Sequence, residues 1–147
     1  MTSISNPHVY GYYKVAGASE PSSTWTLSGS VANSGGVARY TGVSNLSPLD
    51  GAAATGTSAT ATIAAGVPGV TTVSPNAMLV GCVGINSSST AVTIATPADL
   101  GEAWDIGGKR QELADGLQAA AGPTGTKTWT LSSAREFAGW LVALRPA

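Results

Sequence analysis

Short apolar and β-branched runs recur along the whole chain, and clusters of Gly, Pro, Ser and Asn separate them. Runs of about four to nine residues are typical of strands, and patterns of helical length are nearly absent. We predict an all-β fold, a two-sheet antiparallel β-sandwich of jelly-roll type. The predicted strands cover residues 9–16, 24–28, 36–41, 59–64, 70–73, 77–85, 91–94, 103–106, 109–119, 127–132 and 137–144.

Two segments allow a helical interpretation. The Ala, Leu, Glu and Gln content of 109–119 suits a helix, but Gly108 and Gly116 interrupt it and its neighbours are strands, so a strand is preferred. Residues 97–101 form a predicted loop in which Thr96 caps a single helical turn that starts at Pro97.

An internal repeat divides the chain into two related halves. Residues 24–28 read Thr-Trp-Thr-Leu-Ser, and residues 128–132 repeat that sequence. A strand and a loop of similar character precede each copy, and a small-residue turn and an apolar strand follow it. The second half has further strands at 77–85 and 103–106, for which the first half has no counterpart. The first half is therefore expected to present an unpaired sheet edge, which proteins cover, blunt or complete with a strand from another chain. The expected partners are further copies of the chain in a homo-oligomer, or other virion or surface-protein subunits.

Composition and charge narrow the functional classes. A chain of 147 residues fits one domain, in which residues 1–8 are expected to form an N-terminal arm. The net charge is −1 and the seven Lys and Arg residues are scattered, which argues against nucleic-acid binding. No apolar stretch approaches the roughly 18 residues of a membrane span, and the N-terminal residues lack the features of an export signal.

The order of several motifs resembles a known module. The segments that carry this resemblance are 12–21, 24–28, 36–43, 48–50, 78–81 and 141–147. They resemble an Ala/Ser/Thr-rich β-sandwich module that recurs in uncharacterised bacterial surface proteins and in phage and prophage structural proteins. Members of that family carry a further apolar strand before the Tyr-Tyr-Lys-Val segment, which this sequence lacks. The resemblance implies a sandwich in an extracellular or virion setting and supplies no catalytic residue.

The sequence offers few residues that could support catalysis or metal binding. The single histidine, His8, lies in the expected arm, so a nucleophilic triad is not expected. Asp99, Glu102 and Asp105 form the densest acidic group, which we interpret as solvated charges, with a weak calcium site as the alternative. One Cys and one His cannot build a structural zinc site. We therefore expect no enzyme activity and no cofactor.

The tryptophans and the single cysteine are assigned mainly to the core. Trp25 and Trp129 occupy equivalent repeat positions between threonines, which suits an inward indole and outward hydroxyls. Trp140 lies in the apolar final strand, and Cys82 lies inside the apolar run 78–85. All four are predicted core residues.

Three tyrosines form the candidate interface. In a strand, Tyr10 and Tyr12 share one face and Tyr13 takes the other. We predict that these rings contact a neighbouring subunit, with glycan stacking as the alternative. The favoured function is a non-catalytic phage virion component, either a capsid-decorating or a fibre protein. The alternative is an adhesive or carbohydrate-binding module of a bacterial surface protein, located outside the cell or on its surface as part of a longer chain.

Overall fold

A computed structural model of the chain describes residues 7–29, 33–86, 91–106 and 110–147. The described residues form strands and connecting segments without any helix, which confirms the all-β class. Residues 1–6 of the expected arm lie outside the described ranges. The strands are β1 (Ala54–Val67), β2 (Thr71–Thr72), β3 (Ala77–Ile85), β4 (Ile94–Ala95), β5 (Gly101–Asp105), β6 (Gln111–Gln118), β7 (Gly122–Pro123) and β8 (Lys127–Leu144).

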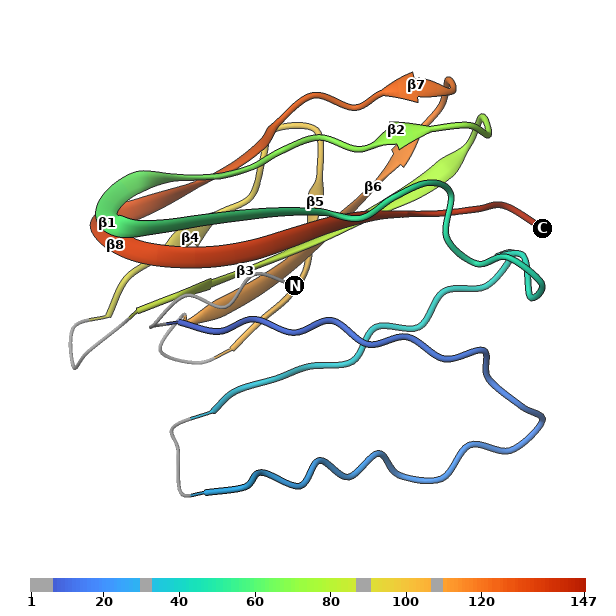
Figure 1. Cartoon of the computed structure of the whole chain (residues 1–147), viewed down its shortest axis with the longest axis horizontal. Coiled ribbons are helices and arrows are strands. Elements are labelled where there is room, and N and C mark those ends of the chain that lie inside the picture. The colour runs from blue at the N-terminus through green and yellow to red at the C-terminus, as the bar shows by residue number, and fades with distance from the viewer. Residues whose placement is uncertain (1–6, 30–32, 87–90, 107–109) are drawn as a thin grey trace.

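A six-stranded sheet dominates the structure (Figure 1). Its strand order is β1-β8-β3-β6-β5, β4 pairs with β8 off this path, and β2 and β7 form a separate two-stranded sheet. All of these pairings are antiparallel. β8 therefore lies inside the sheet, although it is the last strand in sequence.

β1 and β8 pair along their length and fold back together (Figure 1). The register shifts between Ser58 and Ala64 mark the bend, as expected for bulges. At the bend, side-chain hydroxyl groups make hydrogen bonds to the backbone of the same strand. Ser58 Oγ donates to the carbonyl oxygen of Thr60 at 2.7 Å, and Thr62 Oγ1 accepts from the amide of Ala64 at 3.1 Å. The bend brings Gly56 so close to Gly66 that a Cβ on Gly56 would lie 2.4 Å from the Gly66 carbonyl oxygen.

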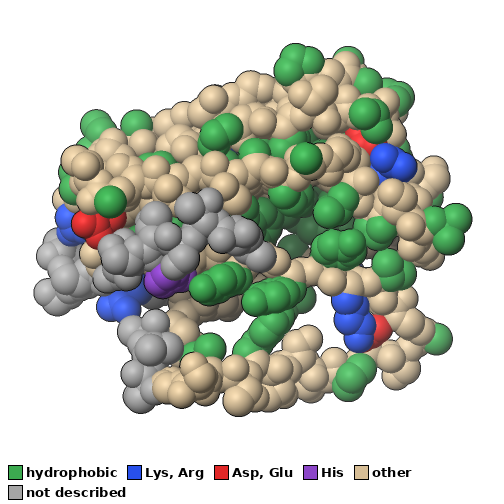
Figure 2. Space-filling model, viewed as in Figure 1, with side chains coloured by type: hydrophobic (Ala, Val, Ile, Leu, Met, Phe, Trp, Pro, Cys, Tyr) green, Lys and Arg blue, Asp and Glu red, His purple; other side chains and the backbone are tan. Residues whose placement is uncertain are grey.

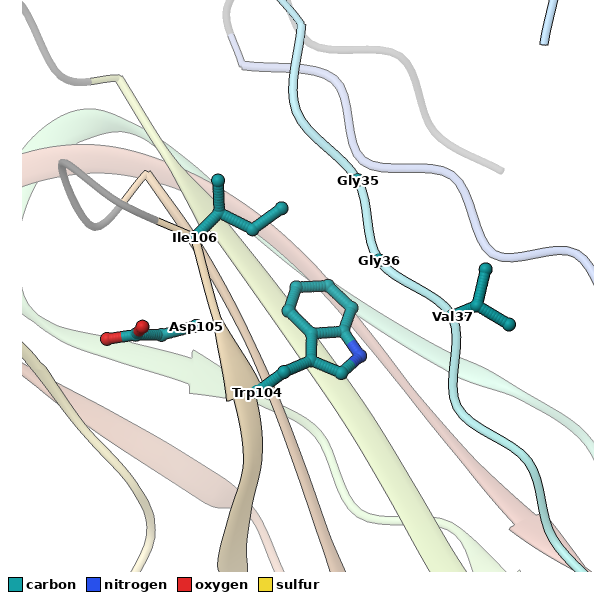
Figure 3. Close-up of a pocket in the computed structure, with 6 residues that line it drawn as sticks. All are labelled: Gly35, Gly36, Val37, Trp104, Asp105 and Ile106. Carbon is teal, nitrogen blue, oxygen red and sulfur yellow. The ribbon is translucent and has the colours of Figure 1, made fainter. Parts of the chain in front are cut away.

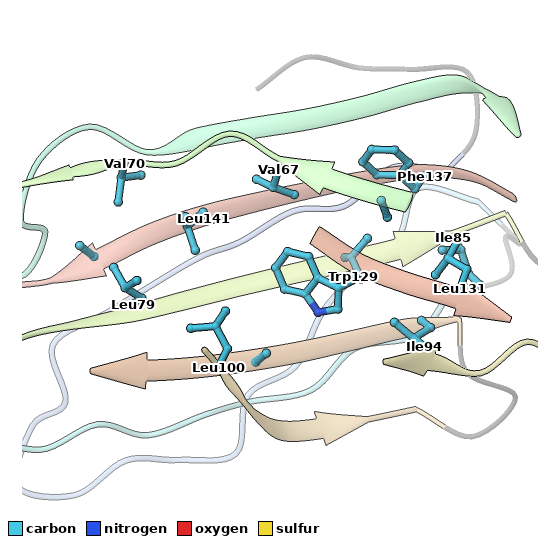
Figure 4. Packing of buried hydrophobic residues seen from close by; sticks show 14 of the residues in the cluster. Val67, Val70, Leu79, Ile85, Ile94, Leu100, Trp129, Leu131, Phe137 and Leu141 are labelled. Atoms are coloured by element: carbon cyan, nitrogen blue, oxygen red, sulfur yellow. The ribbon is translucent and has the colours of Figure 1, made fainter. Parts of the chain in front are cut away.

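The fold-back encloses the main hydrophobic core (Figure 4). Trp129, in the first half of β8, is fully buried and lies over β3, where a Cβ on Gly81 would meet its indole at 2.7 Å. Glycine at position 81 is thus required by the close approach of the ring. The core residues that Figure 4 labels are Val67, Val70, Leu79, Ile85, Ile94, Leu100, Trp129, Leu131, Phe137 and Leu141.

A buried carboxylate fastens the segment before β1 to the end of β8. Asp50 is fully buried and accepts hydrogen bonds from the amides of Val73 and Ser74, from Ser74 Oγ and from Arg145 Nε, all at 2.9–3.0 Å. Burial alone would raise the pKa of Asp50, but the bonds from Ser74, Arg145 and Val73 hold it below its usual value. This carboxylate therefore acts as a charged structural link.

Every strand predicted after residue 54 overlaps a strand of the structure, although 91–94 shares only Ile94 with β4 and β7 was not predicted, whereas no strand predicted before residue 54 forms. Strand 77–85 is β3, 109–119 contains β6 as a strand, and 127–132 and 137–144 join into the bent β8. Pro97 starts a single turn, in which the amide of Leu100 donates a hydrogen bond to the carbonyl oxygen of Pro97. The strands predicted at 9–16, 24–28 and 36–41 are wrong: these residues are extended, but no strand pairing forms there within the described chain. An alternating sequence favours strand geometry, yet a strand also needs a neighbour that supplies hydrogen bonds.

Candidate interaction surface

The described residues before position 42 form an exposed extended ribbon. We call residues 7–29 and 33–41 the N-terminal ribbon; in Figure 1 it leaves the sheet, turns and runs back in blue to cyan. Most of its side chains are exposed, including Tyr10, Tyr12, Tyr13, Trp25 and Leu27. Burial on folding therefore cannot account for this concentration of apolar side chains in a sequence that otherwise places them in a core.

Beneath the ribbon lies a second apolar face of the main sheet. The register aligns Trp140, Cys82, Leu113 and Trp104 in one row across β8, β3, β6 and β5. Val80, Cys82 and Leu113 are buried there, and several partly buried side chains, including those of Trp104 and Trp140, pack against them. The main sheet thus has apolar side chains on both faces.

Two ribbon glycines lie on the two tryptophans that end this row. A Cβ on Gly11 would lie 2.9 Å from the indole of Trp140, and a Cβ on Gly36 would lie 2.6 Å from that of Trp104. Figure 3 shows the Trp104 ring beside the backbone of Gly35 and Gly36. Only glycine permits this approach, so the sequence places glycine where the ribbon crosses an aromatic ring.

Polar contacts hold the returning segment of the ribbon on β6. Tyr40 Oη donates to Asp115 at 2.8 Å, and Ser34 Oγ donates to Gln111 at 3.3 Å. Burial and the neighbouring Asp115 carboxylate together raise the pKa of Tyr40. The Tyr40 hydroxyl therefore stays protonated and keeps donating to Asp115 across the physiological pH range.

The contact between ribbon and sheet is incomplete. Figure 2 shows open spaces between the ribbon and the body of the molecule, with hydrophobic side chains crossing them. A cavity of about 280 Å³ lies between Gly35, Gly36 and Val37 of the ribbon and Trp104, Asp105 and Ile106 of the sheet. The indole N–H groups of Trp104 and Trp140, like that of Trp129 in the main core, find no acceptor in the described parts of the chain. Such an arrangement suits the docking of a further polypeptide segment.

Cys82 lies under the ribbon, so the reactivity of its thiol shows whether the ribbon covers the second face of the sheet. Its thiol is buried and accepts a hydrogen bond from Gln111 Nε2 at 3.4 Å, and burial raises its pKa to about 12. Since the thiolate is the reactive form, we expect the folded chain to react with a disulfide reagent at pH 8 at least about 100-fold more slowly than the urea-unfolded chain. Timed absorbance of the released thiol measures this ratio, and equal rates would show that the ribbon leaves Cys82 accessible.

The four residues that the sequence predicted to lie in the core differ in how deeply the structure buries them. Trp129 and Cys82 are buried, and Trp140 is partly buried on the second face. Trp25, predicted in the core, is instead 63% exposed, because its segment has no neighbouring strand against which to pack. Tyr10, Tyr12 and Tyr13 are all exposed, and their interface role stays a prediction.

Gly11, Gly36 and Trp104 were not singled out from the sequence as a group. The signal that could have found Gly11 is its position as a single glycine within the β-type run 9–16, which marks a close approach by another group. Gly36 follows Gly35 at the start of the run 36–41, where a glycine pair indicates a turn.

The acidic residues do not converge. Asp99 pairs with the buried ammonium group of Lys127, while Glu102 is exposed and Asp105 lines the cavity beside Trp104. In the described ranges, no three His, Cys, Asp or Glu side chains gather as a metal site would require. None of the described elements is a helix of the length and hydrophobicity that a membrane crossing needs.

Comparison of the chain with protein-family models, with curated proteins and with solved structures gave no significant match. Its function is therefore argued from its own residues.

Proposed function

We propose that this chain is a non-catalytic structural protein that assembles with other subunits through its N-terminal ribbon. The observation that carries the proposal is the ribbon itself: an extended, aromatic-rich segment that forms no strand pairing in the described chain. Unpaired extended backbone is a ready template for pairing with another chain. The favoured setting is a phage virion, where the protein decorates the capsid or forms part of a fibre.

The size of the exposed aromatic surface supports assembly. Tyr10, Tyr12, Tyr13 and Trp25 are each more than half exposed. Such rings bury about 150–250 Å² each when covered, so together they supply several hundred Å². That is the scale of one side of a standard protein interface, about 800 Å².

The proposed architecture is a two-sheet sandwich, which suits repetitive assemblies. Its support is the fold-back of β1 and β8, which stacks Trp129 over Gly81 of β3. The ribbon would complete a further layer on the second face once another chain supplies its missing strand partners.

The oligomeric mass tests the proposal. We expect size-exclusion chromatography with light scattering to show a defined oligomer at about 100 μM and dissociation on dilution, the range typical of modest interfaces. A Tyr10→Ser, Tyr12→Ser double variant should shift this equilibrium toward the monomer by at least about tenfold. Val73→Ser is the matched control, because it removes an exposed apolar side chain outside the ribbon. A wild-type chain that stays monomeric throughout would refute assembly through the ribbon.

One observation favours the second candidate, an adhesive or carbohydrate-binding module. The rings of Tyr12 and Trp25 lie 5.4 Å apart at 39° on the exposed ribbon, and paired aromatic rings can stack on sugars. In this function, a glycan would change the tryptophan fluorescence of the wild-type chain, and Trp25→Ala would abolish the change.

A further inference from the structure

We propose that residues 24–28 of one copy insert as a strand into the opening between segments 9–16 and 33–41 of a second copy, and that the exchange is reciprocal. This inference rests on the proposed assembly through the ribbon and names the segment, the acceptor and the partner. The partner is a second copy of this chain.

The repeat shows how this sequence behaves when it has neighbours. Residues 128–132 have the same sequence as 24–28 and lie within β8. There Trp129 pairs with Ala65 of β1 on one side, and Leu131 pairs with Ile94 of β4 on the other. Trp129 and Leu131 are buried, while the residues between and beside them are exposed. This five-residue sequence therefore forms a central strand with one apolar face.

The first copy has the same alternation but no neighbours. Trp25 and Leu27 would share one face of a strand, as Trp129 and Leu131 do, yet here they are 63% and 49% exposed. Trp25 contacts only the ring of Tyr12 among the ring pairs of the described chain. A strand-forming segment is thus left with its apolar face in solvent.

The opening is wide enough for an inserted strand. The ribbon segments rest on opposite ends of the four-strand row, Gly11 on Trp140 and Gly36 on Trp104. Three strand spacings separate the ends of this row, roughly 14 Å at about 4.8 Å each. The two segments are therefore too far apart to pair with each other, and a strand inserted between them could pair with one of the two segments.

The chemistry of the opening fits the inserted segment. Its floor carries Val80, Cys82 and Leu113, all apolar, and residues 24–28 contain no charged side chain. Two groups of ionisable side chains near the opening are engaged, since Asp115 accepts from Tyr40 and Lys14 pairs with Glu20, and Arg39 of segment 33–41 is exposed to solvent. An uncharged strand with Trp and Leu on one face would bury no unpaired charge there.

The segment is kept out of the opening of its own chain by the preceding turn. Glu20 pairs with Lys14 and accepts a hydrogen bond from the amide of Gly17, which closes the turn between segments 9–16 and 24–28. In Figure 1, residues 24–28 accordingly lie farthest from the sheet. A two-fold axis would give two equivalent insertions, and the combined buried area would be on the order of 1,000 Å², enough for a specific interface.

Charge placed on the inserting face tests the proposal. Trp25→Asp should weaken self-association by at least about 100-fold, measured by light scattering over a dilution series, since a central buried tryptophan dominates interface energy. Trp25→Phe should retain association within about tenfold of wild type, and Val73→Ser should leave it unchanged. If Trp25→Asp still associates like wild type while the Tyr10→Ser, Tyr12→Ser variant does not, assembly through the ribbon stands and strand insertion is overturned. A monomeric wild type overturns both.

A synthetic peptide locates the acceptor. The probe is residues 22–29, Ser-Ser-Thr-Trp-Thr-Leu-Ser-Gly, added to the monomeric Trp25→Asp chain; the same peptide with Asp in place of Trp is the control. We expect the probe to slow amide hydrogen exchange by at least about tenfold in one of the two segments, 9–16 or 33–41, and to slow the reaction of Cys82. Unchanged exchange at millimolar peptide, or protection confined to other segments, would overturn the proposed acceptor.

Discussion

Replacing Trp129 with alanine is expected to lower the free energy of unfolding by about 3–5 kcal/mol, the usual cost of removing a buried aromatic side chain. The side chain of Trp129 is fully buried, with 0% exposure, and fills the space over Gly81. Alanine there would leave a large void in the main core. Urea denaturation followed by circular dichroism measures the loss.

The repeat provides a control of identical local sequence. Trp25→Ala, measured at a concentration where the chain is monomeric, should change the free energy of unfolding by less than about 0.5 kcal/mol, because the ring is exposed. Trp129→Phe should recover part of the loss at position 129. Equal effects at positions 25 and 129 would contradict the different environments of the two copies.

The second large effect is expected at the buried carboxylate. Asp50→Ala should lower the free energy of unfolding by about 3 kcal/mol at pH 7, because it removes several charge-assisted hydrogen bonds and leaves Arg145 without its partner. Asp50→Asn keeps the shape and some of the bonds, so we expect a smaller loss. Thermal and urea unfolding of the two variants give the comparison.

The stability that Asp50 contributes should decrease as the pH falls. The folded-state pKa of Asp50 lies below its unfolded value, so the carboxylate contributes its full stabilisation above the unfolded pKa, near 3.9. That contribution disappears as pH falls through the folded-state pKa. The difference between wild type and Asp50→Asn should therefore be constant from pH 5 to pH 7 and shrink below about pH 4. A difference that grows on acidification would show that the Asp50 pKa is raised on folding.

The sequence predicts the fold well where both strand partners lie within the chain. The apolar run 77–85 specifies β3 to the residue, because its side chains are buried on both faces. The bend in β8 was less predictable: the sequence separated 127–132 from 137–144, whereas a continuous strand passes through the Ser-Ala-Arg-Glu segment 133–136 between them. Local sequence indicates a weak point in a strand but does not tell whether the chain breaks or bends there.

At the candidate interaction surface, local sequence is not sufficient to predict which residues are buried. Residues 24–28 and 128–132 are identical, so no local rule could assign Trp129 to the core and Trp25 to the surface. Only the presence of β1 and β4 beside one copy separates them. Alternation likewise placed Tyr10 and Tyr12 on one strand face and Tyr13 on the other, but without a neighbouring strand all three rings are exposed.

The central position of β8 also governs the order in which the chain can fold. β8 pairs with β1, β3 and β4, and Leu141 near its end faces Ala54, more than half the chain away. Contacts so distant in sequence make folding slow, because long loops must close before the pairs contribute. During synthesis, β1 and β3 emerge from the ribosome well before their common neighbour. We therefore expect the sheet to form only once β8 has been synthesised, and the apolar strands made earlier to depend until then on chaperones that cover them.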